Sequence, residues 1–568
     1  MAIEDTIRDS PQVLIDTDSG RLLDKARQAS SFKLQPVFHE LVSSMTTNID
    51  RARIEHEVAQ YYRYATFSHT WEDNEPLFEK VVHIVVYDLE ESTTHDKLQM
   101  FCKIVRDAGY RWAWSDTCCI NKANHFILQE SLVSMFKWYE GSAVTIVLLR
   151  GVRSPAKRGD LMRSIWNTRG WTFQEYHASK VVRFYTEDWK PYLDLEIPNH
   201  KESPEVISEM EGVTGVPARA LMALRPGLDD IREKLRLAST RQTTRVEDSA
   251  YSLLGIFSMT LPVVYGEGDK ALGRFLAQLL TSSGDTSILA WTGRSSGFNS
   301  CLPAKITVFD QLPTTHIPPA LEDAEMDRIT TELQNLGLKP KSVTMLHDRL
   351  RDLPVPSFAV QRMKLPCLSF RLSLSMISRS GSERVYRAET PVLGILEITT
   401  KEDLSRLNAV YAVHPWIDFL LDQQPVGNVT QMIPEENADT DEWVPSISGL
   451  PTSMQADPSY LIPVAPQTRR AWFGRFRRVI ADLHTKTSQY TSSLRSPSSL
   501  LSETDRQGRA LRVVARLRQP FGAMLLTPYL SNAYRRVAAE SLVVAQVVEM
   551  TPAVLNQLIE GVRTLDVL

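Results

Sequence analysis

The sequence predicts an α/β fold with a mostly parallel sheet for its first third. Three short apolar segments, 64–68, 111–118 and 143–149, have the near-continuous hydrophobic character of strands buried on both faces. Helical patterns separate them, and this alternation is typical of a parallel sheet. After about residue 291 the pattern becomes strand-rich without intervening helices, which predicts a separate, antiparallel β-rich region.

The elements follow in order along the chain. The first strand runs into a polar turn, and the segment 94–110 then carries apolar residues on one helix face, with Gly109 as a stop signal. A second helix is predicted over 127–142. The segment 163–179 leads into a third helix, and the segment 180–186 reads as a fourth strand.

Composition indicates an ordinary globular protein that works inside the cell. The chain has 568 residues, 43% of them hydrophobic and 23% charged, with a net charge of -4. Five cysteines are too few for a disulfide framework and suggest a reducing compartment. The acidic N-terminus does not read as a signal peptide. No apolar stretch identified approaches the ~20 residues of a membrane helix. We therefore expect a cytoplasmic protein without a membrane partner.

Changes in composition and in the hydrophobic pattern divide the chain into four parts. An acidic, proline-flanked stretch suggests a flexible loop near 433–451, within the last of them. A basic run at 469–478 interleaves arginine with aromatic residues, but the acidic stretch could mask it, so nucleic acid is not an expected partner. The parts are an N-terminal extension (1–55), an α/β domain (56–200), a helical segment (201–292) and a β-rich C-terminal region (293–568).

Three motifs in this order resemble one known family. They are YATFSHTW (64–71), WSDTCCINK (114–122) and WNTRGWTFQE (166–175), and they follow the pattern of the fungal heterokaryon-incompatibility (HET) domain. The segments 241–257 and 261–275 resemble the region that commonly follows that domain. One departure is Glu72, which stands where the family usually has glycine and leaves the conformation of this turn open.

The resemblance implies a role in fungal non-self recognition and regulated cell death. HET domains are similar to TIR domains, which have a flavodoxin-like α/β fold, and some TIR domains cleave NAD with a glutamate in a Trp-x-x-x-Glu arrangement. WTFQE has that spacing, with Trp171 and Glu175 at its ends. NAD would then be a substrate, and no cofactor is expected. The alternative is a non-catalytic interaction module; in either case self-association through the HET domain is the expected partnership.

The candidate site combines Glu175 as the catalytic group with residues that would hold NAD. Trp171 and Glu175 share a helix face, and a fixed carboxylate stabilises the positive charge that develops on a ribose ring. In open α/β sheets, ligands bind beyond the carboxyl ends of the strands. The alternative is structural, with Trp171 in the core and Glu175 paired with Arg169 or Arg183. The predicted NAD-binding residues are Ser68, His69, Trp71, Asp116, Arg169 and Trp171.

The adjacent Cys118 and Cys119 raise the question of a metal site. They lack the usual C-x2-4-C spacing, and no second pair matches them. Buried, inert thiols are the better interpretation. We therefore expect no metal.

Overall fold

A computed structural model defines the fold. The predicted loop at 433–451 and the basic run at 469–478 lie outside the described residues. The structure describes residues 2–44, 50–215, 224–311, 328–329, 331–333, 335–336, 338–421, 503–530 and 532–568.

A six-stranded sheet in the order β2-β1-β4-β3-β5-β6 forms the N-terminal half of the described chain. Strands β3 to β6 run parallel, whereas β1 and β2 are antiparallel additions at the β4 edge. The parallel arrangement predicted for the first three apolar segments is confirmed, and the predicted fourth strand joins them. The strands are β1 (Val13–Asp16), β2 (Arg21–Asp24), β3 (Tyr64–Ser68), β4 (Trp112–Trp114), β5 (Val144–Leu149) and β6 (Val182–Thr186).

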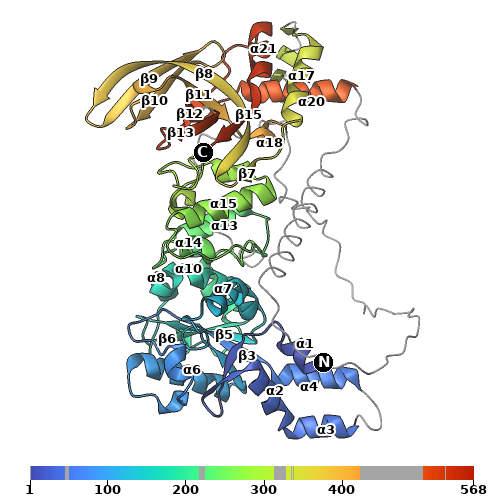
Figure 1. The fold of residues 1–568 in the computed structure, drawn as a ribbon, viewed down its shortest axis with the longest axis vertical. Coiled ribbons are helices and arrows are strands. Elements are labelled where there is room, and N and C mark those ends of the chain that lie inside the picture. Colours follow the sequence, from blue (N-terminus) through green and yellow to red (C-terminus); the bar gives the residue numbers. More distant parts are fainter. Residues whose placement is uncertain are drawn as a thin grey trace, which may run out of the picture. The chain divides into compact units, whose positions relative to one another are not determined.

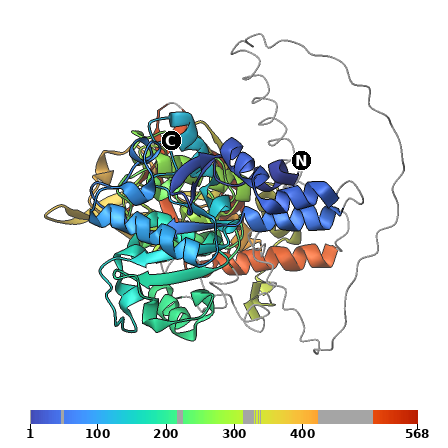
Figure 2. The ribbon, with the colours of Figure 1, turned by 90° about the horizontal axis from the view of Figure 1, so that it is seen from below.

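Helices cover both faces of this sheet. The connection from β3 to β4 crosses the sheet in one direction, and the connection from β4 to β5 crosses it in the other. Because both crossovers are right-handed, α6 (Thr93–Asp107) and α7 (His125–Glu140) lie on opposite faces. Figure 1 shows α6 on one side of the strands and α7 with α10 (Gly170–Ala178) on the other. From below, α6 crosses the near face in medium blue (Figure 2). All three helices were predicted from the sequence, the first of them from apolar residues on one helix face.

The second parallel strand is shorter than predicted. β4 ends at Trp114, so the expectation of a strand to residue 118 was wrong. The reason is local hydrogen bonding. The hydroxyls of Ser115 and Thr117 lie 2.8 Å apart, and the Cys119 amide donates to the Ser115 carbonyl at 2.9 Å. Such short polar side chains offer the backbone a turn in place of a ladder. Asp116 therefore lies in a turn beyond the strand end.

The segment assigned to the N-terminal extension supplies the two antiparallel strands of the sheet. Arg111 forms an ion pair with the buried Asp16 at 2.9 Å and ties β1 to the start of β4. The remainder of this segment is helical. Its helices, with one that crosses the predicted boundary at residue 55, are α1 (Ala2–Ile7), α2 (Lys25–Lys33), α3 (Pro36–Ser44) and α4 (Arg51–Tyr61).

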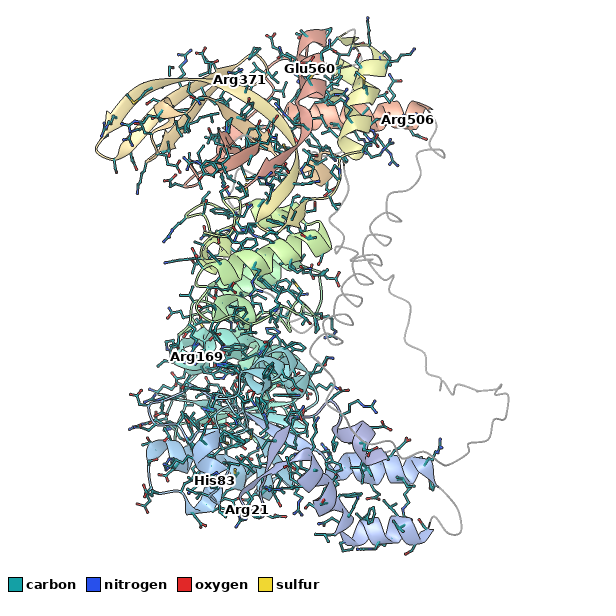
Figure 3. The ribbon with its side chains drawn as sticks, viewed as in Figure 1. Arg21, His83, Arg169, Arg371, Arg506 and Glu560 are labelled. Atoms are coloured by element: carbon teal, nitrogen blue, oxygen red, sulfur yellow. The ribbon has the colours of Figure 1, made fainter. Side chains whose placement is uncertain are left out.

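The middle segment is helical, as predicted, and it is joined to α10. The Gln242 amide donates to the Thr168 carbonyl at 2.6 Å, and the Gly170 amide donates to the Gln242 carbonyl at 2.8 Å. Figure 3 labels Arg169, whose backbone pairs with Gln242 in an isolated parallel bridge. The helices of this segment are α11 (Pro204–Thr214), α13 (Ile231–Ser239), α14 (Asp248–Tyr251) and α15 (Lys270–Ser283).

Substitution of Gly170 should test this junction. A Cβ atom at Gly170 would lie 2.4 Å from Cγ2 of Thr243, closer than real contacts allow. We expect Gly170→Ala to destabilise the protein by ~1–3 kcal/mol, measured by urea denaturation. Adding Thr243→Ser removes Cγ2 and should restore most of the loss. Gly212→Ala is the control, because its new Cβ would meet only the flexible end of Met162, with Sδ at 3.4 Å and Cε at 3.9 Å. Equal midpoints for both alanine variants would contradict close packing at Gly170.

The C-terminal region is β-rich, as predicted, with mainly antiparallel pairing. One path of its sheet runs β10-β9-β8-β11-β12-β13-β15, and only β13 and β15 pair in parallel. Figure 3 labels Arg371 on its long strand β8. None of the described helices has the length and apolar character needed to cross a membrane. The strands are β7 (Ser357–Ala359), β8 (Arg362–Ser380), β9 (Glu383–Thr390), β10 (Gly394–Thr400), β11 (Val410–His414), β12 (Phe521–Tyr529), β13 (Ala533–Val537), β14 (Val543–Ala545) and β15 (Val562–Val567), with helices α17 (Pro340–Arg351), α20 (Glu503–Leu517) and α21 (Pro552–Gly561).

Candidate functional site

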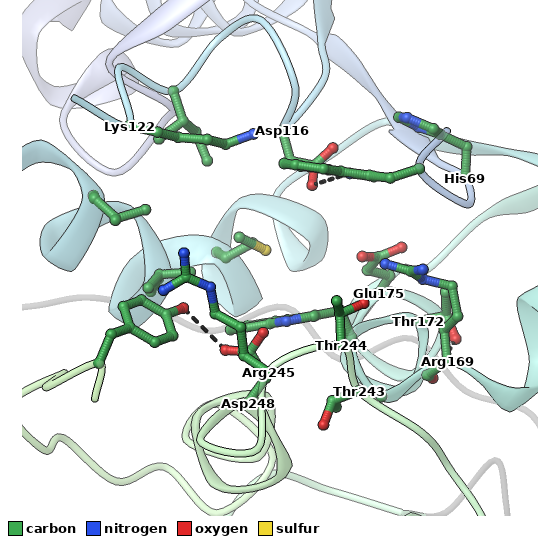
Figure 4. A pocket seen from close by; sticks show the side chains of 18 of the residues that line it. His69, Asp116, Lys122, Arg169, Thr172, Glu175, Thr243, Thr244, Arg245 and Asp248 are labelled. Carbon is green, nitrogen blue, oxygen red and sulfur yellow. Dashed lines mark hydrogen bonds between the residues drawn. The ribbon is translucent and has the colours of Figure 1, made fainter. Parts of the chain in front are cut away.

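A cavity of about 1070 Å³ lies beyond the carboxyl ends of β3, β4 and β5. Two walls face each other across it (Figure 4). One wall comes from the turns after β3 and β4, and the other from α10 and the segment that follows α13. Six of the seven predicted site residues line the cavity, and the seventh, Ser68, contacts Glu175. The lining six are His69, Trp71, Asp116, Arg169, Trp171 and Glu175.

Glu175 is a buried carboxyl group, with 6% of its surface exposed. The Ser68 hydroxyl at the end of β3 donates a hydrogen bond to Oε2 of Glu175 and accepts one from Trp166 Nε1 at 2.8 Å. Burial, reinforced by the nearby Asp116, raises the pKa of Glu175 to about 8. A large share of Glu175 is therefore protonated near neutral pH in the unliganded protein.

The structural alternative for Glu175 required an arginine partner. Among the described residues, no ion pair joins Glu175 to Arg169 or Arg183. Arg169 and Arg241 act on it through longer-range attraction, and both lower the pKa of Glu175. Arg241 is buried, and it donates to the Arg169 carbonyl at 3.1 Å and to the Thr172 hydroxyl at 3.0 Å. A residue of the middle segment thus fixes the first turn of α10.

Trp71, Asp116 and Lys122 form a linked group on the opposite wall. Trp71 Nε1 donates to Oδ2 of Asp116 at 2.9 Å, and Nζ of Lys122 lies 3.5 Å from the centroid of the indole. Burial raises the pKa of Asp116, whereas the attraction of Lys122 opposes that shift. The indole itself is 37% exposed, so it offers the cavity a flat apolar surface.

His69 is buried, and neither of its ring nitrogens has a hydrogen-bond partner in the described part of the chain. Its ring stacks on Phe67 at 4.2 Å, and Nε2 lies 3.8 Å from the Glu75 carboxylate. Burial, followed by repulsion from Lys97, lowers the pKa of His69 well below its usual range. The imidazole is therefore neutral at physiological pH and leaves a donor and an acceptor unused.

Trp171 and Glu175 both line the cavity, as their four-residue spacing on α10 predicts. Trp171 is partly buried against the core, and its side chain lies close enough to Asp248 to lower the pKa of that carboxyl group. The Tyr265 hydroxyl donates to the same carboxylate at 2.9 Å. Trp171 is thus held by the middle segment while part of its ring faces the cavity.

Glu72 is accommodated in the turn after Trp71 without unusual backbone geometry. The left-handed conformation falls on Asn74, with a φ of 64°, so no glycine is required at residue 72. The Glu72 carboxylate pairs with Arg150 at 3.3 Å and with Lys97 at 3.5 Å. The departure from the usual family motif therefore adds an ion-pair network at the rim of the cavity.

The sequence analysis missed the residues that the middle segment brings to the site. The motif RQTTRVEDSAYSLLGIF was identified, but nothing in it showed that it would face α10. The cavity-lining residues missed in this way include Thr243, Thr244, Arg245 and Asp248. Lys122 and Arg150 of the α/β domain also line the cavity and were not predicted as site residues.

The cysteine pair does not contribute to the cavity lining. Cys118 and Cys119 are buried, free thiols with their sulfur atoms 4.0 Å apart. The hydrogen bond to Cys119, together with burial, raises the pKa of Cys118 well above its usual range. Within the described ranges, no group of three His, Cys, Asp or Glu residues is arranged to hold a metal ion.

Comparison with known proteins gives two matches to the N-terminal region. Residues 64–159 match the family model "Heterokaryon incompatibility protein (HET)". The vegetative incompatibility protein HET-E-1 of Podospora anserina is 35% identical over 226 residues, which cover 37% of this chain and 16% of that protein. The chain thus spans about one sixth of the length of this curated relative. No solved structure gives a significant match.

The family match and the cavity overlap only in part. His69, Trp71 and Asp116 lie inside the matched residues, whereas α10 with Trp171 and Glu175 follows them. The relative's longer stretch of similarity supports the same assignment as the family model. Residues 64–159 of this chain are therefore similar to the heterokaryon-incompatibility (HET) family, and the similarity to HET-E-1 agrees with that match.

Proposed function

We propose that the chain cleaves NAD at the bond between nicotinamide and ribose, with Glu175 as the catalytic group. The observation that carries the proposal is a buried carboxyl at the wall of a large cavity, one helical turn from the partly exposed Trp171. The parallel strands run in the order second, first, third, fourth, as the first four strands of a flavodoxin-like sheet do. This order supports the TIR-like interpretation of the domain. The cavity lies at the corresponding switch point, where such sheets bind ligands.

Cleavage of this bond requires the protein mainly to position NAD and to stabilise the positive charge that develops on the ribose. The C–N bond breaks, its electron pair leaves with nicotinamide as a neutral base, and positive charge develops on the ribose ring. Water then adds to C1′ and loses a proton, which gives ADP-ribose. An ionised Glu175 beneath the ring would stabilise the developing charge, as carboxylates do in glycosyl transfer. The Ser68 hydroxyl, held by Trp166, positions that carboxylate.

Cleavage should depend on pH through Glu175. Its pKa of about 8 means that the ionised fraction of the free protein rises tenfold per pH unit below that value. We expect kcat/KM for NAD to rise about tenfold per unit from pH 6 to 7 and to level off above pH 8. Initial rates of nicotinamide release, corrected for spontaneous NAD breakdown, measure this profile. A flat profile between pH 6 and 9 would exclude Glu175 as the ionising group.

The biological role that we propose is regulated cell death in fungal non-self recognition, in which HET domains become active when they are brought together. The HET match and the similarity to a vegetative incompatibility protein support it. The full chain, incubated with NAD with and without a crowding agent, should release nicotinamide faster when it is assembled. Oligomer formation without any nicotinamide release would favour the alternative, a non-catalytic interaction module.

A further inference from the structure

We infer that the cavity binds the diphosphate of a dinucleotide between Lys122 on one wall and Arg169 and Arg245 on the other. This inference rests on the proposed function and extends it from the reacting bond to the anionic part of the substrate. Figure 4 shows Lys122 across the cavity from Arg169 and Arg245. Arg245 belongs to the middle segment, outside the residues that match the HET family.

Lys122 is the strongest evidence for an anion at this place. Its Nζ is buried and has no hydrogen-bond acceptor among the described residues, although an ammonium group has three protons to donate. Its contact with the protein is the face of Trp71, at 3.5 Å from the ring centroid. A buried cation without acceptors is costly to maintain, and a phosphate oxygen would supply them.

The two arginines on the opposite wall act on nearby carboxyl groups through longer-range attraction. Arg245 lowers the pKa of Asp248, and Arg169 lowers the pKa of Glu175. In the part of the chain that the structure describes, neither Arg169 nor Arg245 forms an ion pair, whereas Arg150 at the rim is paired with Glu72. The Arg245 guanidinium lies 4.3 Å from the centroid of Tyr265, which orients it without using its N–H donors. A guanidinium fork matches phosphate oxygens well.

The acidic groups of the cavity would oppose an anion if all were ionised. Burial raises the pKa of Asp116 and of Asp248, so at a given pH each carries less negative charge than an exposed carboxyl group would. The cavity, at about 1070 Å³, is at the upper end of the range for small-molecule sites and accommodates more than a nicotinamide ring. Both features fit a ligand that carries phosphate between two ring systems.

Calorimetric titration of the full chain tests the inference without requiring turnover. The ligands are ADP-ribose, inorganic diphosphate and adenosine, which carries no phosphate. We expect Lys122→Met and Arg245→Gln each to weaken ADP-ribose binding about 10- to 100-fold, with adenosine binding unchanged. Arg163→Gln, at an exposed arginine that pairs with Asp160 outside the cavity, makes the same change in net charge and should bind ADP-ribose normally. Inorganic diphosphate should bind the wild type more tightly than either cavity variant.

The outcomes separate this inference from the proposed function. If the wild type does not bind ADP-ribose, or if both cavity variants bind it as tightly as Arg163→Gln does, the diphosphate site is wrong. If ADP-ribose binding shows the expected losses but NAD yields no nicotinamide, the diphosphate site stands and the cleavage proposal fails.

Discussion

Replacement of Glu175 by Gln should lower the rate of nicotinamide release at saturating NAD by about 10²–10³-fold. The loss of a group that stabilises transition-state charge typically has this size. Glutamine keeps the length of the side chain, and its oxygen can accept the hydrogen bond that the Ser68 hydroxyl now gives to Glu175. The effect should therefore appear in kcat with little change in the affinity for NAD.

A matched carboxylate distinguishes this effect from a general loss of charge. Glu130 lies on α7 outside the cavity lining and accepts a hydrogen bond from Gln12 at 2.8 Å. Glu130→Gln should keep wild-type turnover. Unchanged turnover in Glu175→Gln, measured on folded protein, would remove Glu175 from the mechanism.

The second large effect concerns stability, and its sign follows from the pKa of Glu175. In the unfolded chain this carboxyl ionises near pH 4.5, whereas in the folded protein it holds its proton up to about pH 8. Wild-type stability should therefore fall as pH rises through this window, by an amount on the order of 3–5 kcal/mol. Glu175→Gln cannot titrate, so it should gain stability relative to the wild type between pH 5 and pH 8.

Urea denaturation of both proteins at pH 5, 6, 7 and 8 measures this difference. Any fixed cost of burying the carboxamide shifts all four values equally and leaves the trend with pH intact. A stability difference that stays constant across the series would mean that the Glu175 carboxyl ionises freely in the folded state. The pH dependence proposed for catalysis would then lose its basis as well.

The sequence predicted those features of the fold that depend on local pattern. The strands at 64–68 and 143–149 were recognised because runs of buried apolar residues carry their own signal, and the helix-separated order predicted a parallel sheet. The second strand was predicted too long, because the hydroxyl and amide bonds that turn the chain after Trp114 are not visible in an apolar pattern.

Part of the candidate site could be predicted from the sequence, because it follows from the order of strands and helices. Ser68, Asp116 and Glu175 come from strand ends and from one helix face, so topology alone brings them together. Trp166 holds the Ser68 hydroxyl that contacts Glu175, and the buried Arg241 holds the first turn of α10. Arg245 reaches the cavity because the middle segment is joined to α10. These are long-range packing contacts between segments about 70 residues apart, as the Arg241 hydrogen bonds are, and no local pattern reveals them.

The most direct test of the account is to identify the products that the purified full chain makes from NAD at pH 8 with a crowding agent. Chromatography with mass detection should show nicotinamide and ADP-ribose in equal amounts, accumulating with wild type and Glu130→Gln and nearly absent with Glu175→Gln. NAD that stays intact under conditions where the chain binds ADP-ribose would contradict the proposal that this cavity is catalytic. Release of AMP and nicotinamide mononucleotide instead would place cleavage at the diphosphate and would contradict the role assigned to Glu175.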